Sequence, residues 1–470
     1  KTENFKSNDG NKDIFVTGDI VTFGDDAAKT SVVLNDPVSP KSVVFKNSSK
    51  DYTLSGSGSI IGNASLIKEG TGNLTIQNIN TFTGGVNINE GRLTVSSLAN
   101  TDGVAYGALG GVDNTITLSG GTLAVSDNVV SSQPVKLNGI GGIYVLSGKT
   151  LTANGKVTSS SESTLQKSGA GTLLLGGSAK YNILEIAQGT LQGGEINSVH
   201  QYPTKIILNG GTLKDPDNIY SYSTNSANIE VPEGKKATWT LDSRCDYKGK
   251  LTGAGTLTVN VTSVRCNMQG DWSEFEGTIN FQKQKTGSYD PLIQWNNTKG
   301  LGKATVTGVF DNSGKNVAIG TIQGNATLTG AGSYTAGQLS LSVVRGRGNS
   351  TNTMITVEGT LSVTDAITVT WTGTAPKLGE TITLWKVGRL SASANVTLNL
   401  PTLADGLYWD TTDLLKPEGV LRVTDQPTGI QGVSQDRYHD GKIYTLSGVP
   451  VENPTKKGIY IKNGKKFTIK

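Results

Sequence analysis

Two histidines, His200 and His439, are the first residues to consider for acid-base chemistry. Both lie among polar neighbours, and neither adjoins a candidate nucleophile or has the spacing of a metal-binding motif. A Ser-His-Asp triad can assemble from distant positions, but such a set is not visible here. No four-ligand zinc set is visible either. We therefore predict no catalytic residue, no metal site and no cofactor.

The two cysteines, Cys245 and Cys266, lie 21 residues apart. If this spacing is close to one turn of a repetitive fold, the two would stack on adjacent turns. A disulfide needs Cα atoms about 5.5 Å apart, which is slightly more than the distance between stacked strands. Cys245–Cys266 is thus a candidate disulfide, suited to an oxidising compartment. The alternative is two unbridged thiols.

Carboxylates could serve a cation-dependent lyase. Pairs with even spacing project from one face of a strand and could hold a cation, whereas a pair with odd spacing meets only across a turn. Such a lyase would use an Arg or Lys as its base, and Arg244 and Arg265, each preceding a cysteine, could form an exposed ladder near Asp242 or Asp246. The simpler interpretation, which we favour, is a surface charge ladder. The pairs are Asp242 with Asp246, Glu274 with Glu276 and, with odd spacing, Asp410 with Asp413.

Six tryptophans all fall in the second half of the chain. Exposed indole rings can stack on sugars, although core packing of large aromatics is commoner. We name Trp272, Trp239 and Trp295 as candidate glycan contacts. Trp272 comes first because it follows a Gly-Asp pair typical of a loop.

Composition indicates which elements would position these residues. Hydrophobic residues make up 35%, Gly numbers 61 and Pro only 13, and the apolar residues fall in short alternating runs. This pattern predicts an ordered all-β chain with many turns rather than a disordered one. A net charge of +4 with 17% charged residues is too mild for nucleic-acid binding. No apolar run is long enough for a transmembrane helix.

Internal repeats define the fold class. Residues 66–95 and 165–193 share an apolar-x-Lys-x-Gly-x-Gly-x-Leu run and a later Gly-x-Leu. Each unit reads as strand, Gly or Asn corner, strand, and such a unit buries its apolar face only by stacking on others. We predict an all-β parallel β-helix (β-solenoid) over residues 1–424, with roughly 20 to 25 residues per rung. A string of β-sandwiches would need more aromatics than the 6% present.

The stretch LIKEGTGNLTIQNINTFTGGVNINEGRLTV (66–95) resembles the autotransporter-associated β-strand repeat. Segment 270–281 resembles a rung of long Bacteroidetes versions of such proteins, and segment 403–423 resembles the closing segment of these solenoids. The resemblance implies a right-handed β-helix that is exported from a Gram-negative bacterium and has no catalytic residues of its own. It also implies an accessory region of a polysaccharide-active protein, with a catalytic domain upstream of Lys1.

The tail, residues 442–470, is similar to the C-terminal sorting domains of Bacteroidetes secreted proteins. Its Asn463-Gly464 pair between alternating strands is a strong hairpin signal. The resemblance implies a separate β module over residues 425–470 that contacts the secretion machinery. A simple β-cap that covers the last rung is the alternative.

We therefore expect a non-catalytic, secreted or cell-surface rod rather than an enzyme. One alternative is an adhesin module that binds a polysaccharide or a host glycan, since solenoid faces suit repeated weak contacts. A polysaccharide lyase is the second alternative.

Overall fold

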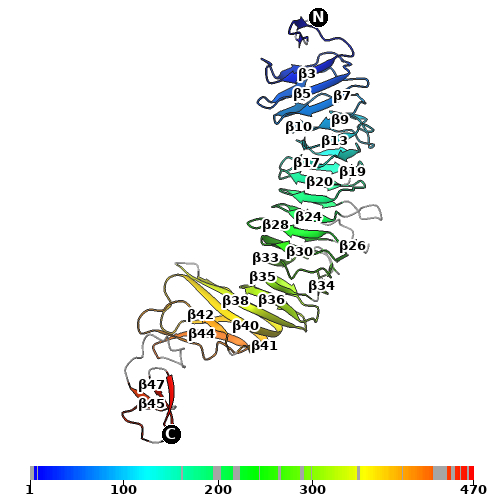
Figure 1. The fold of residues 1–470 in the computed structure, drawn as a ribbon. Helices are drawn as coiled ribbons and strands as arrows, with labels where there is room; N and C mark the ends of the chain where they lie inside the picture. Colours follow the sequence, from blue (N-terminus) through cyan, green and yellow to red (C-terminus); the bar gives the residue numbers. More distant parts are fainter. Residues whose placement is uncertain are drawn as a thin grey trace.

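The computed structural model consists of β-strands joined by turns. It describes residues 5–7, 9–159, 162–193, 203–214, 223–242, 244–262, 266–285, 290–297, 299–346, 350–393, 395–426, 442–445, 450–455, 457–462 and 465–469. Every regular element in these ranges is a β-strand, and none of them holds a helix able to cross a membrane. The strands stack into an elongated rod (Figure 1).

The rod is a stack of rungs whose strands form sheets along its length, and we number its sides in chain order. Side 1 contains β3 (Ile20–Gly24), β5 (Ser42–Lys46), β7 (Ser65–Glu69), β9 (Val86–Ile88), β13 (Ile116–Leu118), β16 (Val135–Leu137) and β19 (Val157–Ser159). Side 2 contains β4 (Ser31–Val33), β6 (Tyr52–Ser55), β8 (Asn73–Ile76), β10 (Arg92–Val95), β14 (Thr122–Val125), β17 (Ile140–Val145), β20 (Thr164–Ser168), β22 (Ile183–Ile186), β24 (Lys205–Leu208), β27 (Asn228–Val231) and β30 (Leu251–Gly253).

Side 3 is the longest sheet and continues past the other two. It contains β15 (Val129–Ser131), β18 (Thr150–Ala153), β21 (Thr172–Leu175), β23 (Thr190–Gly193), β25 (Thr212–Lys214), β28 (Lys236–Leu241), β31 (Thr256–Val261), β33 (Thr278–Lys283), β35 (Leu301–Asp311), β36 (Val317–Gln323), β37 (Thr327–Thr329), β38 (Ser333–Arg345), β39 (Ser350–Asn352), β40 (Ile355–Gly373), β41 (Thr381–Ala392), β42 (Thr397–Asn399), β43 (Tyr408–Asp410) and β44 (Glu418–Thr424). After side 1 ends, its place in the chain order is taken by β26 (Ser223–Asn225), β29 (Cys245–Tyr247), β32 (Cys266–Met268) and β34 (Ile293–Trp295).

Neighbouring rungs pair in parallel and in register. Ile206 lies above Ile229, and Ile229 lies above Leu251, so successive equivalent residues are 23 and 22 positions apart. Leu93 pairs with Leu74, 19 positions before it, and with Leu123, 30 positions after it. The longer turn contains a small hairpin, β11 (Tyr106–Gly107) with β12 (Gly110–Gly111). The observed spacing agrees with the expected 20 to 25 residues for most rungs.

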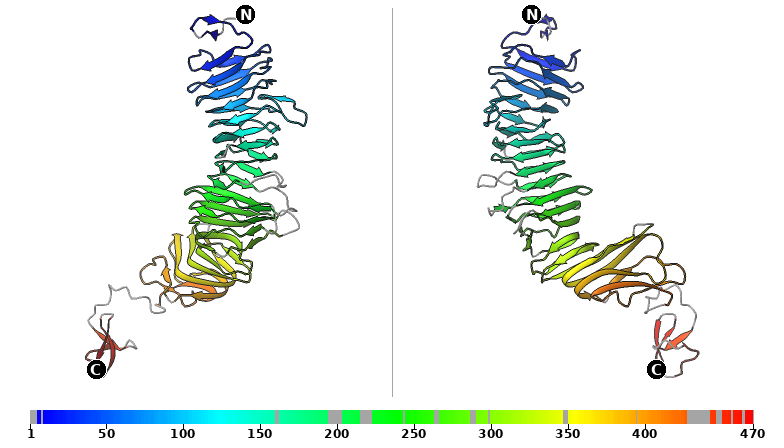
Figure 2. Two further views of the ribbon diagram at one scale, coloured as in Figure 1. Left: turned by 45° about the vertical axis from the view of Figure 1, so that its right-hand side comes forward. Right: turned by 180° about the vertical axis from the view of Figure 1, so that it is seen from behind.

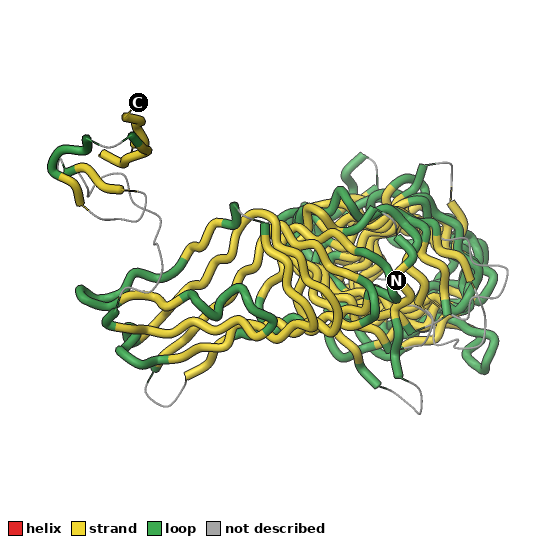
Figure 3. Tube along the Cα trace, turned by 90° about the horizontal axis from the view of Figure 1, so that it is seen from below, coloured by secondary structure: helices red, strands yellow, loops and turns green. Residues whose placement is uncertain are grey.

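Alternation decides which side chains fill the core. Strand β31 has the burial pattern expected for a half-buried strand, with Leu257, Val259 and Val261 inside and the intervening residues partly exposed. The same inward columns continue along the rod as one apolar cluster. In the view along the rod, the strands surround the space that this apolar cluster occupies (Figure 3).

The rod changes character in its last third. Strands β38, β40 and β41 are much longer than those of the earlier rungs and fan out to one side (Figure 2). Pairing also turns antiparallel, because β44 runs against both β41 and β43. The resemblance of segment 403–423 predicted a closing segment at this place, but the sequence did not predict its antiparallel pairing.

The two ends of the chain form small antiparallel sheets. At the N-terminal end, β1 (Phe5–Lys6) pairs with β2 (Lys12–Asp13). At the C-terminal end, β45 (Ile443–Thr445), β46 (Pro450–Val451), β47 (Gly458–Lys462) and β48 (Lys465–Ile469) form a separate sheet. The described strands thus confirm the all-β class and the parallel stack. The handedness of the helix stays a prediction.

Candidate functional site

The two sequence repeats occupy different sides of the rod. In the first copy, the Lys-containing strand β7 lies on side 1 and the following strand β8 on side 2. In the second copy, the equivalent strands β20 and β21 lie on sides 2 and 3. The repeat has therefore moved around the rod by one side between copies. Contacts that both copies make in their corners therefore depend on the residues of the repeat and not on one particular side of the rod.

The lysine of the first copy points into the core. Lys68 is fully buried and stacks in register between Phe45 above it and Ile88 below it. Its ammonium group donates hydrogen bonds to the carbonyl oxygens of Glu69 (2.9 Å) and Gly70 (2.5 Å) at its own corner. A third, longer contact of 3.5 Å reaches the carbonyl of Glu90 in the next rung.

The lysine of the second copy makes the same contacts. Lys167 is fully buried between Ile143 and Ile186. Its ammonium group donates to the carbonyl oxygens of Ser168 (2.8 Å), Gly169 (2.7 Å) and, in the next rung, Gln188 (3.1 Å). The agreement between two copies on different sides identifies a built feature, which we call the lysine corner.

Burial changes the acidity of both lysines. It lowers the pKa of Lys68 and of Lys167 from 10.5 to about 8, because the charged form loses its hydration. At Lys68 the negative charges of Glu90, Asp51 and Asp25 oppose this shift. Both groups are therefore mainly protonated at neutral pH, when an ammonium donates most strongly to carbonyls.

Glycines allow the corners to stack. Gly169 and Gly189 lie in the corners of adjacent rungs, with φ of 70° and 69°, a conformation that favours Gly. A Cβ on Gly189 would lie 2.3 Å from the carbonyl oxygen of Gly169 and 2.4 Å from that of Gly171. Gly91 meets the carbonyls of Gly70 and Gly72 in the same way. The repeated glycines therefore allow both the positive φ of the corners and the close approach of adjacent rungs.

Sequence analysis aligned the two lysines but assigned them no role. A usable signal was present, because Lys68 has the same parity as Leu66 and must share its inward face in a strand. The Gly carbonyls that follow within two residues are in reach of a long side chain. A lysine at an inward position before a Gly-x-Gly corner is thus a readable sign of this contact.

The predicted glycan contacts are wrong for this fold. Trp239, Trp272 and Trp295 have exposures of 1%, 2% and 0%. Trp239 and Trp295 fall on the inward parity of β28 and β34. Trp272 lies in a turn, yet its ring packs between the other two, with ring centroids 6.2 Å from Trp239 and 5.6 Å from Trp295. A ring buried in this cluster presents no face to a sugar in solvent.

The two cysteines lie where the sequence placed them. Both are fully buried, and the register of β29 with β32 sets Cys245 and Cys266 on adjacent rungs. The Cys266 Sγ atom lies 4.0 Å from the carbonyl oxygen of Leu241. The stacking required for a bridge is therefore present, and the bridge itself stays a prediction.

Basic side chains engage Glu274, Glu276 and Asp242, whereas Asp246 accepts a hydrogen bond from the Asn267 amide (2.9 Å). Lys303 contacts Glu274 at 2.8 Å and Glu276 at 3.4 Å. Asp242 pairs with Lys214 at 3.2 Å. Within the described ranges, no group of three or more acidic, His or Cys side chains is arranged to hold a metal ion. These contacts agree with the charge-ladder interpretation.

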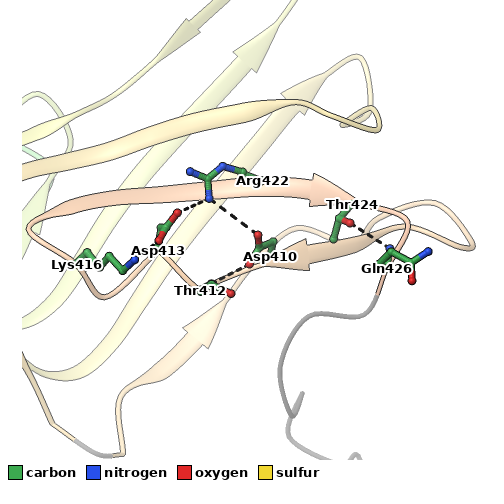
Figure 4. Close-up of polar contacts among 7 residues, drawn as sticks. All are labelled: Asp410, Thr412, Asp413, Lys416, Arg422, Thr424 and Gln426. Atoms are coloured by element: carbon green, nitrogen blue, oxygen red, sulfur yellow. Dashed lines mark hydrogen bonds and ion pairs between the residues drawn. The ribbon is translucent and has the colours of Figure 1, made fainter.

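The Asp410–Asp413 pair is part of a turn network in the closing segment (Figure 4). Arg422 on β44 contacts Asp413 and lies 4.0 Å from Asp410, and Lys416 also contacts Asp413. The hydrogen bonds from Lys416 and Arg422 lower the pKa of Asp413. The network links the turn after β43 to β44, so its role is structural.

Some residues considered from the sequence lie outside the described ranges. These are His200, His439, Arg265 and the Asn463-Gly464 turn. Arg244 is described, and its Nε atom is buried without a hydrogen-bond partner among the described residues.

Comparison with known proteins agrees with the repeat at one place. Residues 66–95 match the Passenger-associated-transport-repeat family. The match contains Lys68, Gly70 and Gly91, and it spans β7 to β10. No curated protein matches the chain. The matched segment is thus similar to an autotransporter-associated repeat, a feature of β-helical passenger regions that are secreted or surface-exposed.

Proposed function

We propose that this chain is an exported, non-catalytic β-helical rod that acts as a structural or accessory region of a surface or secreted polysaccharide-active protein. The observation that carries the proposal is the continuous parallel ladder, in which each rung covers the apolar face of the next. The passenger-type repeat at 66–95 supports export. We place the source among Gram-negative Bacteroidetes and the helix in the right-handed class on the basis of the resemblance.

A rod that acts by reach should tolerate the loss of a whole rung. Deletion of residues 141–164 joins Ile140 to Leu165, which already stacks on Gly141 in the same register. The deletion removes one strand from each side and shortens the rod by about 4.8 Å. We expect the variant to keep the far-UV circular dichroism and protease resistance of the parent.

The matched control removes half a rung. Deletion of residues 141–152 joins Ile140 to Ala153, which belongs to side 3. Strands would then meet the wrong side, so we expect misfolding. Equal tolerance of both deletions would contradict a registered rod.

Catalysis is tested separately on the purified chain. We expect no turnover of pectin or other uronans with or without Ca²⁺. Calcium-dependent release of unsaturated uronides would refute the non-catalytic assignment and favour a lyase.

The C-terminal sheet is proposed to contact the secretion machinery. Tyr460 and Phe467 pack together across β47 and β48, with ring centroids 5.9 Å apart. Removal of residues 442–470 should block export while the rod remains folded in the cell. Unchanged export would assign this sheet to capping instead.

A further inference from the structure

A hollow of about 530 Å³ opens near the end of β40. One wall is the end of β40 with the loop after it, and the other is the end of the neighbouring strand β42, where Asn399 pairs with Thr368, with the loop that follows. Its volume lies within the range of small-ligand sites. The lining residues are Thr368, Val369, Thr370, Trp371, Ala375, Pro376, Asn399, Leu400, Pro401 and Thr402.

Two tryptophans hold these walls in place. The indole N–H of Trp371 donates to the carbonyl oxygen of Thr374 (2.7 Å), in the first loop. The indole N–H of Trp409 donates to the carbonyl oxygen of Pro401 (2.8 Å), in the second loop. The two rings pack with centroids 6.1 Å apart. The hollow is thus shaped before any ligand arrives, which lowers the ordering cost of binding.

Trp371 itself is fixed but remains partly exposed. The guanidinium of Arg345 lies 5.0 Å from its ring centroid, and Glu380 holds Arg345 through a hydrogen bond of 2.6 Å. Unlike Trp239, Trp272 and Trp295, this ring keeps surface at a hollow. A rigid, amphipathic ring of this kind is suited to the C–H face of a ligand.

The polar groups of the lining are neutral. Three threonine hydroxyls and the Asn399 carboxamide provide donors and acceptors, and none of the lining side chains is charged. Asn399 donates to the hydroxyl of Thr368 at 3.1 Å, which orients its amide. Hydroxyl and amide groups beside an indole and two prolines match a ligand with hydroxyl groups and apolar C–H faces.

We propose that this hollow binds a neutral oligosaccharide, with Trp371 as the stacking ring and Asn399 as a polar contact. The proposal goes beyond the rod function, which depends on the ladder and not on this hollow. The guanidinium of Arg345 beside the ring is already paired with Glu380, and none of the lining side chains is charged. The carboxylates of a uronate-rich glycan would therefore gain no free cation, so the chemistry favours neutral sugars.

Binding of the intact chain to immobilised oligosaccharides tests the proposal. The panel contains neutral cello-, xylo-, manno- and N-acetylchito-oligosaccharides, together with oligogalacturonates and proline-rich peptides. We expect binding within the neutral set, with Trp371→Ala and Asn399→Ala each weakening it about tenfold or more. Trp371→Phe, which keeps a ring, should retain part of the affinity. Tyr106→Ala, which removes an exposed aromatic in the distant β11–β12 hairpin, should change nothing.

Circular dichroism of each variant separates loss of binding from loss of fold. If Trp371→Ala unfolds, Asn399→Ala and Trp371→Phe decide the matter, since Asn399 is exposed. No binding to any neutral sugar would overturn the proposal. Binding of neutral sugars that is unchanged in both Asn399→Ala and Trp371→Phe would also overturn it. Binding of uronates or peptides without binding of neutral sugars would overturn it as well.

Discussion

Replacement of Lys167 by methionine removes the ammonium group while keeping a side chain of similar length in the core. The carbonyls of Ser168, Gly169 and Gln188 lose their shared donor. At roughly 1 kcal/mol for each buried carbonyl, this costs about 3 kcal/mol. The same change removes a buried charge, which raises the free energy of unfolding, whereas the loss of the hydrogen bonds lowers it.

The pKa gives the size and the sign of the charge effect. Burial lowers the pKa of Lys167 from 10.5 to about 8, and the resulting difference corresponds to about 3 kcal/mol. Between these two pH values the unfolded chain binds more protons than the folded one, so the free energy of unfolding rises with pH. The cost of burying the charge is fully present below pH 8 and is relieved above about pH 10.5.

We therefore expect Lys167→Met to change stability by at most about 1 kcal/mol at pH 7, where the two effects offset. By pH 10.5 the parent should be more stable than the variant by up to about 3 kcal/mol. Urea denaturation followed by far-UV circular dichroism from pH 7 to pH 10.5 measures the difference. Because stacked repeats can unfold in parts, the transition midpoints of parent and variant are compared at each pH.

Lys136→Met is the matched control, because Lys136 is exposed on β16, a strand of side 1. Its midpoint should follow that of the parent across the whole range. Identical pH dependence in the parent and in Lys167→Met would refute the lysine corner as a buried, titrating contact. A pH-dependent difference in transition midpoint between the parent and Lys136→Met would also refute it.

Three further predictions concern corners, core and covalent links. Gly189→Ala should destabilise the rod by about 1–3 kcal/mol more than Gly148→Ala in urea denaturation, since Gly148 has a similar φ of 72° but open space around its Cβ position; equal costs would show that φ alone decides. Trp272→Ala should cost about 3–5 kcal/mol by the cavity it leaves and should leave glycan binding unchanged; a mild effect on stability would contradict the buried cluster. Protein exported into an oxidising medium should show no reactive thiol at Cys245 or Cys266 when unfolded without reductant, and two thiols by colorimetric titration would exclude the bridge.

The alternation of apolar and polar residues and the spacing of the glycines were enough to predict much of the fold from the sequence. A strand that alternates apolar and polar residues has one buried face, and the rung spacing follows from the distance between recurring motifs. The stacking of Cys245 over Cys266 follows from the same spacing. These are local properties, so they can be read without knowing the neighbours of each strand.

The candidate site was harder to predict from the sequence. Trp272 sits in a Gly-Asp-Trp turn that looks exposed, yet its neighbours across the rungs, Trp239 and Trp295, enclose it. Trp371 has no distinguishing motif, and its hollow exists because β42 and the loop after it, about 30 residues further along the chain, lie beside the end of β40. Burial of a turn residue depends on which rungs lie above and below it.

The sequence by itself determined the strand pattern, the Gly corners and the inward parity of Lys68 and Lys167, because side-chain direction along a strand has a period of two. Only the tertiary structure decided which carbonyls each ammonium meets, since Glu90 and Gln188 come from the following rung. It also decided the shift of the repeat by one side between copies. That shift depends on the summed length of the intervening turns, which no single motif specifies.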